Sequence, residues 1–535
     1  MRRRDISMAL LGSAAASTLV TREAKAQTCN LPCYPTTEAE TAAGVVPSNS
    51  SYPPGNVLRY GVDQTGIADS TAAIQRAMNV AWASGYYLHP WSGGGGAAPV
   101  VLFPPGRYRV TGTVTVPTGV TVRGAGHPAH TTNHTRIIMD SPAGQDNRNS
   151  PIFRFNRATL NNAVLMNARL CSSIEDLEFW YVTPGGNMNA PHGIGISFGS
   201  YPQGGALMFD VDVTDTRIIN CVFQHAPAAI RIKNVPGSSG TRGDGWNGSD
   251  GVGMFIENCE FDASCTHIYA TGSALDLQFK HCQFFGSMHR YEGCTGSVVY
   301  QAGRWHGAAY VDAATVGNTF SKFAIKGADI EISNASRFLS LNKATLIDIS
   351  QNSVISGASG ASWIEVTDAE GGCIVSNAIN DSGYNASPGS GIADFVAAIK
   401  MRGCYRVLVS ANNITATDPA IYNGFGILSG SSSRAPLYNF INGNAVTAPY
   451  NGAGFNGQNR YINVGASDIL GINYSLHGTD NGFLSRNLPV QTLTVLDGAS
   501  PPPNIAGKAS IFVDANDGHM KAMFGDGTVR VLAQH

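Results

Sequence analysis

The stretch Ile218–Phe223 reads IINCVF, and close variants follow as FIENCEF at Phe255–Phe261 and FKHCQFF at Phe279–Phe285. In each copy a polar residue stands directly before a cysteine, inside a short apolar phrase. Recurrence of one phrase is typical of solenoids, in which each repeat is a coil that packs only on its neighbours. The repetition therefore predicts a fold of stacked, similar coils.

A looser form of the phrase is asparagine, any residue, then an apolar residue, and it runs through most of the chain. It begins at Asn220, Asn318, Asn352, Asn377, Asn412 and Asn444, with near variants at Asn258 and His281. The intervals between copies are unequal. They disfavour a helical repeat of fixed length and suit a coil with constant strands, one constant turn and variable loops.

The segments around these phrases, such as RVLVSANNIT at Arg406–Thr415, alternate apolar with polar or small residues, which is the period of a β-strand. An antiparallel sandwich has such strands too. The recurring asparagine favours a parallel β-helix, in which equivalent residues stack ~4.8 Å apart. We expect each asparagine to sit in a turn with a left-handed backbone and bond to the next coil, and each following Cys or Ala to fill the interior. Chance recurrence in an asparagine-rich chain is the alternative.

The composition fits an all-β chain. Of 535 residues only 13% are charged and 62 are glycine, which disfavours a helical protein. The formal net charge of −2 gives no reason to expect nucleic acid or a membrane surface as partner.

The N-terminus, residues 1–26, has the pattern of a bacterial export signal. Arg2–Arg4 precede a mildly apolar stretch, Ile6–Val20, and Ala24 and Ala26 are placed for cleavage before Gln27. The arginines favour the twin-arginine route, and the stretch is too short to span a bilayer. An ordinary N-terminal helix is the alternative. We expect a secreted or periplasmic protein without a membrane span.

Ten cysteines in an exported protein suggest disulfides. Cys29 and Cys33 are close enough to pair in a loop, whereas Cys221, Cys259 and Cys282 suit the interior as small apolar fillers. No Cys or His spacing indicates zinc, so no metal site is predicted.

The front of the chain carries an amphipathic helix over residues 69–84. Asp69 is its expected N-cap, and one stripe is apolar: Ala73, Ile74, Ala77, Met78 and Ala81. Such a helix would cap the open end of a solenoid.

Three phrases in this region carry a family resemblance: YGVDQTGIADSTAAIQ (Tyr60–Gln75), LFPPGRY (Leu102–Tyr108) and VRGAG (Val122–Gly126). Together they resemble the opening of the pectate-lyase-like superfamily, which includes polygalacturonases, rhamnogalacturonases, exo-glucanases and phage tailspikes. The resemblance implies a single-stranded right-handed parallel β-helix. It implies little about chemistry, because the superfamily contains lyases, hydrolases and epimerases.

These features predict five segments: the export signal (1–26), an N-terminal linker (27–56), the β-helix (57–485), a Pro-rich linker (486–507) and a small C-terminal β element (508–535). The last is expected to have two or three strands joined at Asp517-Gly518 and Asp526-Gly527. Either it resembles an element that ends some phage tail proteins, or it caps the last coil.

Candidate catalytic carboxylates lie in MFDVDVTD, Met208–Asp215. On one strand Asp210 and Asp212 would share a face roughly 7 Å apart, which suits the acid and base of an inverting glycosidase, or a calcium ion if the protein is a lyase. A solvated strand face is the alternative. The glycine-rich segment 237–253 adds Asp244 and Asp250 as further candidate acids and Trp246 as a ring to stack on a sugar, unless it is only a flexible insertion.

Candidate substrate-binding cations lie in AAIRIKNV, where Arg231 and Lys233 share a face, and AAIKMRG repeats the pattern at Lys400 and Arg402. The first phrase resembles the one with which polygalacturonases hold a substrate carboxylate. The other polygalacturonase motifs are missing, and His192-Gly193 is only a partial match to one of them. His192 and Tyr269 complete the predicted binding residues, and His267, His289, Arg290, Glu292 and the run Arg304–His306 add further proton-transfer and stacking groups.

We therefore expect an exported β-helix protein, monomeric or homotrimeric, that binds and hydrolyses an acidic polysaccharide without a cofactor. The alternatives are a lyase that acts on uronates, with calcium possible, and a non-catalytic adhesin or tailspike-like protein. An enzyme needs two titratable groups that converge on one bond, whereas a binder needs only aromatic and hydrogen-bonding groups.

Overall fold

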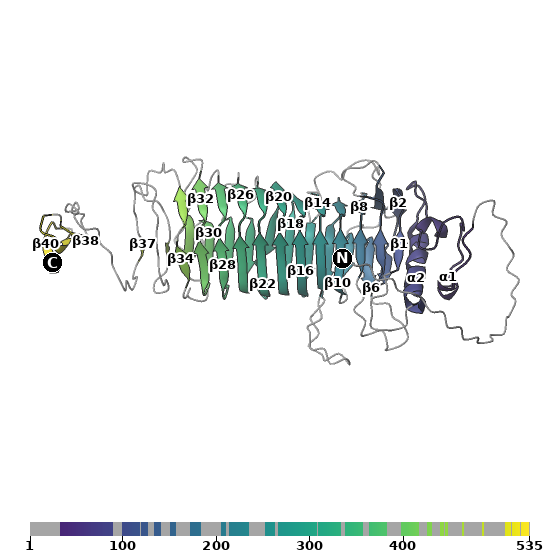
Figure 1. Ribbon diagram of the computed structural model, residues 1–535, viewed down its shortest axis with the longest axis horizontal. Helices are drawn as coiled ribbons and strands as arrows, with labels where there is room; N and C mark the ends of the chain where they lie inside the picture. Colours follow the sequence, from purple (N-terminus) through teal and green to yellow (C-terminus); the bar gives the residue numbers. More distant parts are fainter. Residues whose placement is uncertain are drawn as a thin grey trace, which may run out of the picture.

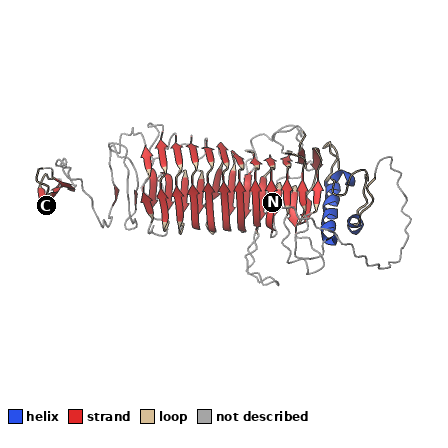
Figure 2. Cartoon of the chain, viewed as in Figure 1, coloured by secondary structure: helices blue, strands red, loops and turns tan. Residues whose placement is uncertain are grey.

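The computed structural model describes residues 33–88, 99–117, 119–126, 133–140, 150–156, 172–182, 205–209, 213–234, 252–262, 266–307, 309–332, 338–356, 363–381, 397–416, 425–430, 439–442, 444–447, 463–464, 484–485, 509–514, 516–524 and 526–533. Most of these residues are in strands (Figure 2).

Three long parallel sheets run side by side along the molecule (Figure 1). Sheet A contains β1 (Val100–Leu102), β4 (Thr121–Arg123), β7 (Ser173–Glu175), β10 (Val213–Ile219), β13 (Val252–Glu257), β16 (Ala274–Lys280), β19 (Thr295–Gln301), β22 (Thr319–Lys326), β25 (Ala344–Ser350), β28 (Gly372–Val375), β31 (Val407–Ser410) and β34 (Phe440–Asn442). Sheet B contains β2 (Gly106–Val110), β5 (Thr135–Met139), β8 (Glu178–Tyr181), β11 (Val222–Gln224), β14 (Glu260–Phe261), β17 (Gln283–Phe285), β20 (Arg304–Gly307), β23 (Asp329–Ile332), β26 (Ser353–Ser356), β29 (Ala378–Asp381), β32 (Asn413–Ala416) and β35 (Ala445–Thr447). Sheet C contains β3 (Val114–Pro117), β6 (Phe153–Asn156), β9 (Leu207–Phe209), β12 (Ala228–Lys233), β15 (Thr266–Thr271), β18 (Met288–Glu292), β21 (Tyr310–Ala313), β24 (Leu339–Asn342), β27 (Ile364–Thr367), β30 (Ala397–Arg402), β33 (Phe425–Gly430), β36 (Asn463–Val464) and β37 (Leu484–Ser485).

The chain visits the sheets in the order A, B, C and then returns to A one strand further along, so each coil has three strands. Every strand of the stack pairs in parallel with its equivalents in the neighbouring coils, as β13 does with β10 and β16. The predicted right-handed parallel β-helix is confirmed.

The N-terminal end of the stack is covered by α2 (Thr71–Leu88), as predicted. Asp69 Oδ1 accepts the Thr71 backbone N–H at 3.0 Å, and all residues of the predicted apolar stripe are buried. Gln75 also bonds both backbone groups of Thr115 on β3, the first strand of sheet C, at 2.8 and 3.1 Å. The helix therefore satisfies an edge strand that would otherwise invite pairing with another chain.

Residues 33–56, expected to be a linker, are folded. They contain α1 (Glu38–Ala42) and lead into the 3-10 helix η1 (Val57–Tyr60). Glu40 and Arg59 form an ion pair at 2.5 Å with both side chains fully buried, and Tyr60 donates to Glu40 at 3.1 Å. This buried ion pair holds α1 against η1, because removal of either partner would leave the other as an unpaired buried charge.

At the turn between sheets A and B, not every asparagine of the repeated phrase occupies the left-handed position predicted for it. In the early coils Asn220, Asn258 and His281 have left-handed φ angles of 54°, 53° and 53°, and the cysteine after each points inward. From β25 onward the left-handed residue is the one that precedes the asparagine, not the asparagine itself. There, Gln351, Ser376 and Ala411 have φ angles of 59°, 57° and 54°.

In these later coils Asn352, Asn377 and Asn412 occupy the inward position that the cysteines hold earlier, and all are buried. Each side-chain amide donates to the amide oxygen of the next asparagine at 2.8 Å, up to Asn444. Asn318 belongs to a different turn, between sheets C and A, where its Oδ1 accepts the Cys294 N–H at 2.8 Å. The predicted asparagine ladder is present. The asparagines of the repeated phrase nevertheless occupy three different positions: the left-handed turn residue, the inward residue after it, and the turn between sheets C and A.

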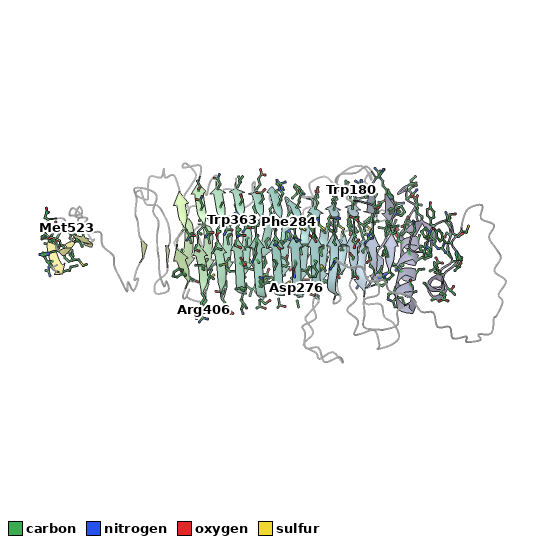
Figure 3. All side chains as sticks on the ribbon, viewed as in Figure 1. Trp180, Asp276, Phe284, Trp363, Arg406 and Met523 are labelled. Carbon is green, nitrogen blue, oxygen red and sulfur yellow. The ribbon has the colours of Figure 1, made fainter. Side chains whose placement is uncertain are left out.

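The interior is packed by stacked equivalents from successive coils. Phe179, Phe223, Phe261, Phe284 and Trp305 follow one another on sheet B, with ring centroids 5.2, 5.1, 5.1 and 4.3 Å apart. Phe284 and the later Trp363 are labelled in Figure 3. Cys221, Cys259 and Cys282 are buried free thiols, as predicted.

The C-terminal residues form a separate antiparallel sheet of β38 (Ala509–Val513), β39 (Met520–Phe524) and β40 (Val529–Ala533). Gly518 and Gly527, in the predicted Asp-Gly turns, have positive φ angles of 68° and 85°. Cys33 is disulfide-bonded. No helix in the described ranges is long and apolar enough to cross a membrane.

Candidate functional site

The outer face of sheet C carries a column of polar side chains. Strand register aligns Arg231, Tyr269, Arg290, Asp312, Ser340, Glu365 and Lys400 on successive coils. A second column, two residues further along the strands, includes Lys233, Thr271, Glu292, Asn342, Thr367 and Arg402. The face therefore carries charged and neutral polar groups, with equivalent positions ~4.8 Å apart along the axis.

The two cationic phrases found in the sequence occupy equivalent places on this face. Lys400 lies in the column of Arg231, and Arg402 in the column of Lys233, six strands further along sheet C. Their side chains point outward because Ile230, Ile232 and Met401 take the inward positions of the same strands. The repeated phrase therefore places cations on the outer face of sheet C in two separate coils.

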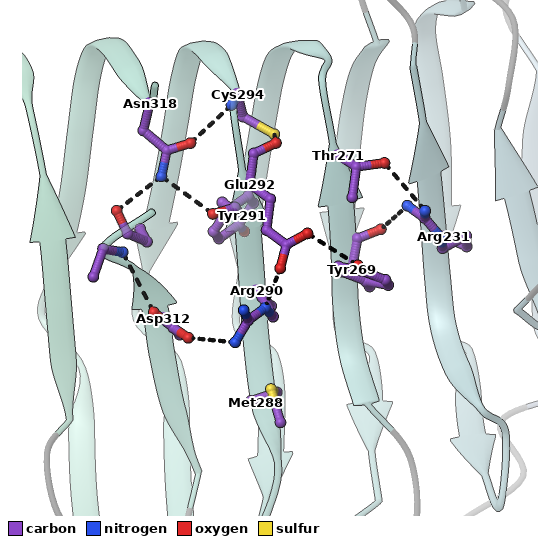
Figure 4. Close-up of polar contacts among 12 residues, drawn as sticks. Arg231, Tyr269, Thr271, Met288, Arg290, Tyr291, Glu292, Cys294, Asp312 and Asn318 are labelled. Carbon is purple, nitrogen blue, oxygen red and sulfur yellow. Dashed lines mark hydrogen bonds and ion pairs between the residues drawn. The ribbon is translucent and has the colours of Figure 1, made fainter. Parts of the chain in front are cut away.

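The centre of the face is a chain of polar contacts (Figure 4). The Tyr269 hydroxyl donates to Glu292 Oε2 at 3.0 Å. Arg290 then bridges two carboxylates, donating from Nε to Glu292 Oε1 at 2.5 Å and from Nη1 to Asp312 Oδ2 at 2.8 Å. Arg290, Glu292 and Asp312 keep 21%, 25% and 25% of their side chains exposed, so a ligand can reach them.

Arg231 supports this chain from one side. Its guanidinium lies 4.2 Å from the Tyr269 ring centroid and donates to the backbone oxygens of Ile232 and Tyr269 and to Thr271 Oγ1. The residue is 2% exposed, and its Nε–H has no acceptor among the described residues. In this conformation Arg231 holds Tyr269 in place and presents little surface to a ligand.

Burial shapes the electrostatics of this pair. Burial lowers the pKa of Arg231 below its ordinary value. Burial, together with the hydrogen bond to Glu292, raises the pKa of Tyr269 to about 12. At neutral pH Tyr269 is therefore a protonated hydrogen-bond donor.

A second charged group lies further along the same face. Lys400 Nζ and Arg402 Nη1 are 3.6 and 3.9 Å from Glu365 Oε1. Lys400 is only 4% exposed, whereas the Arg402 side chain is 30% exposed, so Arg402 is the cation of this pair that a ligand can reach.

The strongest sequence candidates lie outside the described residues: Asp210, Asp212, Asp244, Asp250, Trp246 and His192. The assumption that Met208–Asp215 forms one strand is wrong. Phe209 ends β9 in sheet C, and Val213 begins β10 in sheet A, so the chain changes sheet between them. The spacing expected for two carboxylates on one strand does not apply there.

The two segments that carry these candidate acids nevertheless follow neighbouring strands of sheet C. Asp210 follows Phe209 at the end of β9, and segment 235–250 follows the end of β12. These two strands are hydrogen-bonded neighbours, with Phe209 in register with Ile232. The described strands that precede the two segments, β9 and β12, therefore end next to each other on adjacent coils of sheet C.

Several residues grouped with the site by sequence lie in the core instead. His267, His289 and Trp305 are fully buried, because their strands turn these positions inward. Asp312 was missed, since the short strand β21 gives too little alternation to single it out. No group of three His, Cys, Asp or Glu residues that could hold a metal ion occurs in the described part of the chain.

Arg290 holds both Glu292 and Asp312 by charge-assisted hydrogen bonds, so the guanidinium and the two carboxylates form one fixed, partly exposed polar group on sheet C.

Comparison with known proteins agrees with the fold. Residues 55–179 match the family model described as rhamnogalacturonase A/epimerase, pectate lyase-like, which covers the N-terminal cap and the first coils. No curated protein is detectably similar in sequence to this chain.

Among solved structures, the Agl-KA catalytic domain is 12% identical over 80% of this chain and 70% of its own, with a TM-score of 0.40. The A-module of the Azotobacter vinelandii mannuronan C-5 epimerase AlgE4 is 14% identical over 77% and 100%, with a TM-score of 0.35. The Dettilon tailspike protein is 12% identical over 78% and 68%, with a TM-score of 0.36. Likeness at this level carries no argument about function.

Proposed function

We propose that this chain, whose residues 55–179 match the family model described as rhamnogalacturonase A/epimerase, pectate lyase-like, binds an acidic polysaccharide along the outer face of sheet C and hydrolyses its glycosidic bonds. One observation carries the proposal. β9 and β12, the strands that directly precede the segments bearing Asp210, Asp212, Asp244 and Asp250 in the sequence, are hydrogen-bonded neighbours in sheet C, with Phe209 in register with Ile232.

In this proposal the acid and base are Asp210 and Asp212, or one of them with Asp244 or Asp250. The described carboxylates Glu292 and Asp312 are a further source of the base. Lys233 and Arg402 hold substrate carboxylates, and Arg231 positions Tyr269. Trp246 stacks on a sugar ring, and His192 completes the binding residues.

The N-terminal pattern supports export through the twin-arginine route, so the protein would meet its polysaccharide outside the cytoplasm. The reaction as proposed needs no cofactor.

A second candidate function is glycan binding without cleavage. It is favoured by the ion pairs that already engage Arg290, Glu292 and Asp312. A face whose charges are paired can hold a sugar by hydrogen bonds and still lack a group free to react.

The test is a polysaccharide panel, acidic and neutral, incubated with the protein and followed by reducing ends and by the ultraviolet absorbance of unsaturated uronates. We expect reducing ends without absorbance. The double variant Asp210→Asn/Asp212→Asn should lose about 100-fold or more of the rate, the usual contribution of a positioned acid or base.

The matched control is Asp276→Asn. Asp276, labelled in Figure 3, is an exposed aspartate on sheet A, away from the proposed site, and its variant should keep full activity. Absorbance rising with the reducing ends would replace hydrolysis by β-elimination. Glycan binding with neither signal would leave the binding function, and unchanged activity in the double variant would remove Asp210 and Asp212 from the reaction.

A further inference from the structure

A second polar cluster lies on the outer face of sheet B, near the N-terminal end of the stack. Arg136 on β5 and Glu178 on β8 are in register, and Arg136 Nε donates to Glu178 Oε2 at 2.8 Å. His134 Nε2 lies 2.7 Å from the same carboxylate oxygen. The Glu178 side chain is 3% exposed, whereas those of Arg136 and His134 are 19% and 20% exposed. One buried carboxylate therefore orients two basic groups that solvent can reach.

Trp180, two residues after Glu178 on β8, supports the same arginine. It lies on the outer side of the stack (labelled in Figure 3), because Phe179 and Tyr181 take the inward positions of this strand. The guanidinium carbon of Arg136 lies 4.4 Å from the centroid of the indole ring. A cation over an indole ring is attracted to it. The ring and the carboxylate together hold Arg136 in one conformation before any ligand arrives, which lowers the entropic cost of binding.

The Arg136 side chain still has donors to offer. A guanidinium carries five N–H donors, and the ion pair with Glu178 uses the one on Nε. The two Nη groups donate to no residue in the part of the chain that the structure describes. The Nη end of Arg136 therefore remains for a ligand.

A neighbouring ion pair on the same two coils shows the contrast. Arg123 on β4 and Glu175 on β7 are in register on sheet A. There both Nε and Nη2 of the arginine contact Glu175 Oε2, at 2.6 and 2.5 Å, and no described aromatic ring lies under the guanidinium. Arg123 thus turns an Nη group toward its glutamate, whereas Arg136 keeps both Nη groups away from Glu178.

A second arginine lies directly beside Arg136. The register places Arg107 of β2 next to Arg136 on the preceding coil, and Arg107 is exposed. Equivalent positions on neighbouring strands are ~4.8 Å apart, and like charges in such a pair repel each other. An anion bound between the two guanidinium groups relieves this repulsion. The pair therefore favours a negatively charged ligand.

We propose that Arg136 and Arg107 form a second binding site, on sheet B, for an oxyanion of an acidic polysaccharide, either a carboxylate or a sulfate ester. The Nη end of a guanidinium matches the two oxygens of such a group. Glu178 and Trp180 act as positioning residues for Arg136. The preference for an oxyanion rests on the geometry of Arg136, whereas its place on a polysaccharide rests on the proposed function.

The consequence for binding is a second point of attachment. A polymer held on sheet B stays close to the face of sheet C, and linked sites raise the effective affinity.

The first test uses the unchanged full-length protein. Phenylglyoxal modifies accessible guanidinium groups, and mass spectrometry of the digest gives the rate at each arginine. At about ten times its Kd, a polyuronate or a sulfated polysaccharide should slow modification of Arg136 and Arg107 about 10-fold. Arg123, whose side chain is 48% exposed, should react at its usual rate, and a neutral polysaccharide should protect no arginine.

The two charged polymers also distinguish the two sources of the oxyanion. Protection by the polyuronate alone assigns a carboxylate, protection by the sulfated polymer alone assigns a sulfate ester, and protection by both supports the shared site. Equal slowing at Arg123, no slowing at Arg136, or protection by inorganic sulfate but by neither polymer would overturn the proposal.

The second test uses calorimetric titration of the protecting polymer into variants. Arg136→Gln should weaken binding about 10-fold, and Arg136→Lys nearly as much, because lysine keeps the charge and loses the paired donors. The matched control, Arg123→Gln, should bind like the unchanged protein. Full affinity in Arg136→Lys would contradict recognition by paired donors.

The variant Asp210→Asn/Asp212→Asn separates this site from the proposed hydrolysis. It should lose the release of reducing ends and keep the protection of Arg136. Loss of that protection in the same variant would show that the site on sheet B is not independent.

Discussion

Replacing Asn412 by alanine should lower the free energy of unfolding by about 4 kcal/mol, because several buried polar groups lose their partners at once. Asn412 Oδ1 accepts from the Asn377 backbone N–H and side-chain amide at 3.1 and 2.8 Å. Its own amide donates to the Ile374 carbonyl at 2.9 Å and to Asn444 Oδ1 at 2.8 Å. Each buried group left unpaired costs ~1–3 kcal/mol.

The neighbouring residue provides the control. Asn413 is exposed on the outer side of β32 and contributes no bond to the ladder, so Asn413→Ala should stay within about 0.5 kcal/mol of the unchanged protein. Urea denaturation followed by tryptophan fluorescence compares the two. Equal unfolding midpoints for Asn412→Ala and Asn413→Ala would show that the ladder is not a source of stability.

Acidification between pH 6.5 and 4 should destabilise the protein by about 3 kcal/mol through His267 alone. Burial, opposed by backbone hydrogen bonds, lowers the pKa of this residue from 6.5 to about 4. Burial and the charge of a protonated His267 also lower the pKa of His289. Below pH 6.5 the unfolded chain takes up protons that the folded chain refuses, so stability is full at pH 7.5 and falls toward pH 4.

A chain of hydrogen bonds with assigned donors and acceptors explains why the buried histidines His267 and His289 resist protonation. The Phe285 carbonyl can only accept, so His267 Nε2 donates to it at 3.1 Å, and His267 Nδ1 must accept from His289 Nε2 at 3.3 Å. His289 Nδ1 then accepts from the Tyr300 hydroxyl at 2.9 Å, and Tyr300 accepts from Tyr291 at 2.5 Å. In this arrangement an added proton on His267 Nδ1 places two donors face to face.

The measurement is the free energy of unfolding as a function of pH. The slope between pH 6.5 and 4 should shrink to about half in His267→Phe and nearly vanish in His267→Phe/His289→Phe, whatever their stability at pH 8. The control His281→Asn changes an exposed histidine that keeps its left-handed turn, and its slope should be unchanged. Carboxylates with a lowered pKa, such as Asp63 at about 2, lose their contribution only at lower pH. The same slope in the double variant would contradict the assignment.

The sequence was sufficient for the solenoid because equivalent residues in a parallel stack must resemble one another. The positions of Cys221, Cys259 and Cys282 follow from that rule. The phase of the later asparagines did not follow, since the left-handed residue moves from Asn220 in the early coils to Gln351 further on. Small polar residues tolerate both the turn and the interior position next to it, so composition cannot separate the two.

The residues of the candidate site could be predicted only in part from the sequence, for a related reason. In β18 both faces carry polar residues, with His289 and Tyr291 inside and Arg290 and Glu292 outside. Hydrophobic alternation cannot decide which set is buried there. The bridge from Arg290 to Asp312 joins neighbouring coils, and its register depends on loop lengths that sequence patterns do not constrain.

The parallel sheets also determine how the molecule responds to force. The hydrogen bonds between coils run along the long axis of the stack (Figure 1). Sideways bending is therefore shared among many strands, whereas tension along the axis loads only the bonds of the outermost coil. At the N-terminal end, Gln75 adds bonds from α2 to the first strand of sheet C. Under axial tension the coils should peel off one at a time from the C-terminal end, in small steps of unequal length, because the coils contain different numbers of residues.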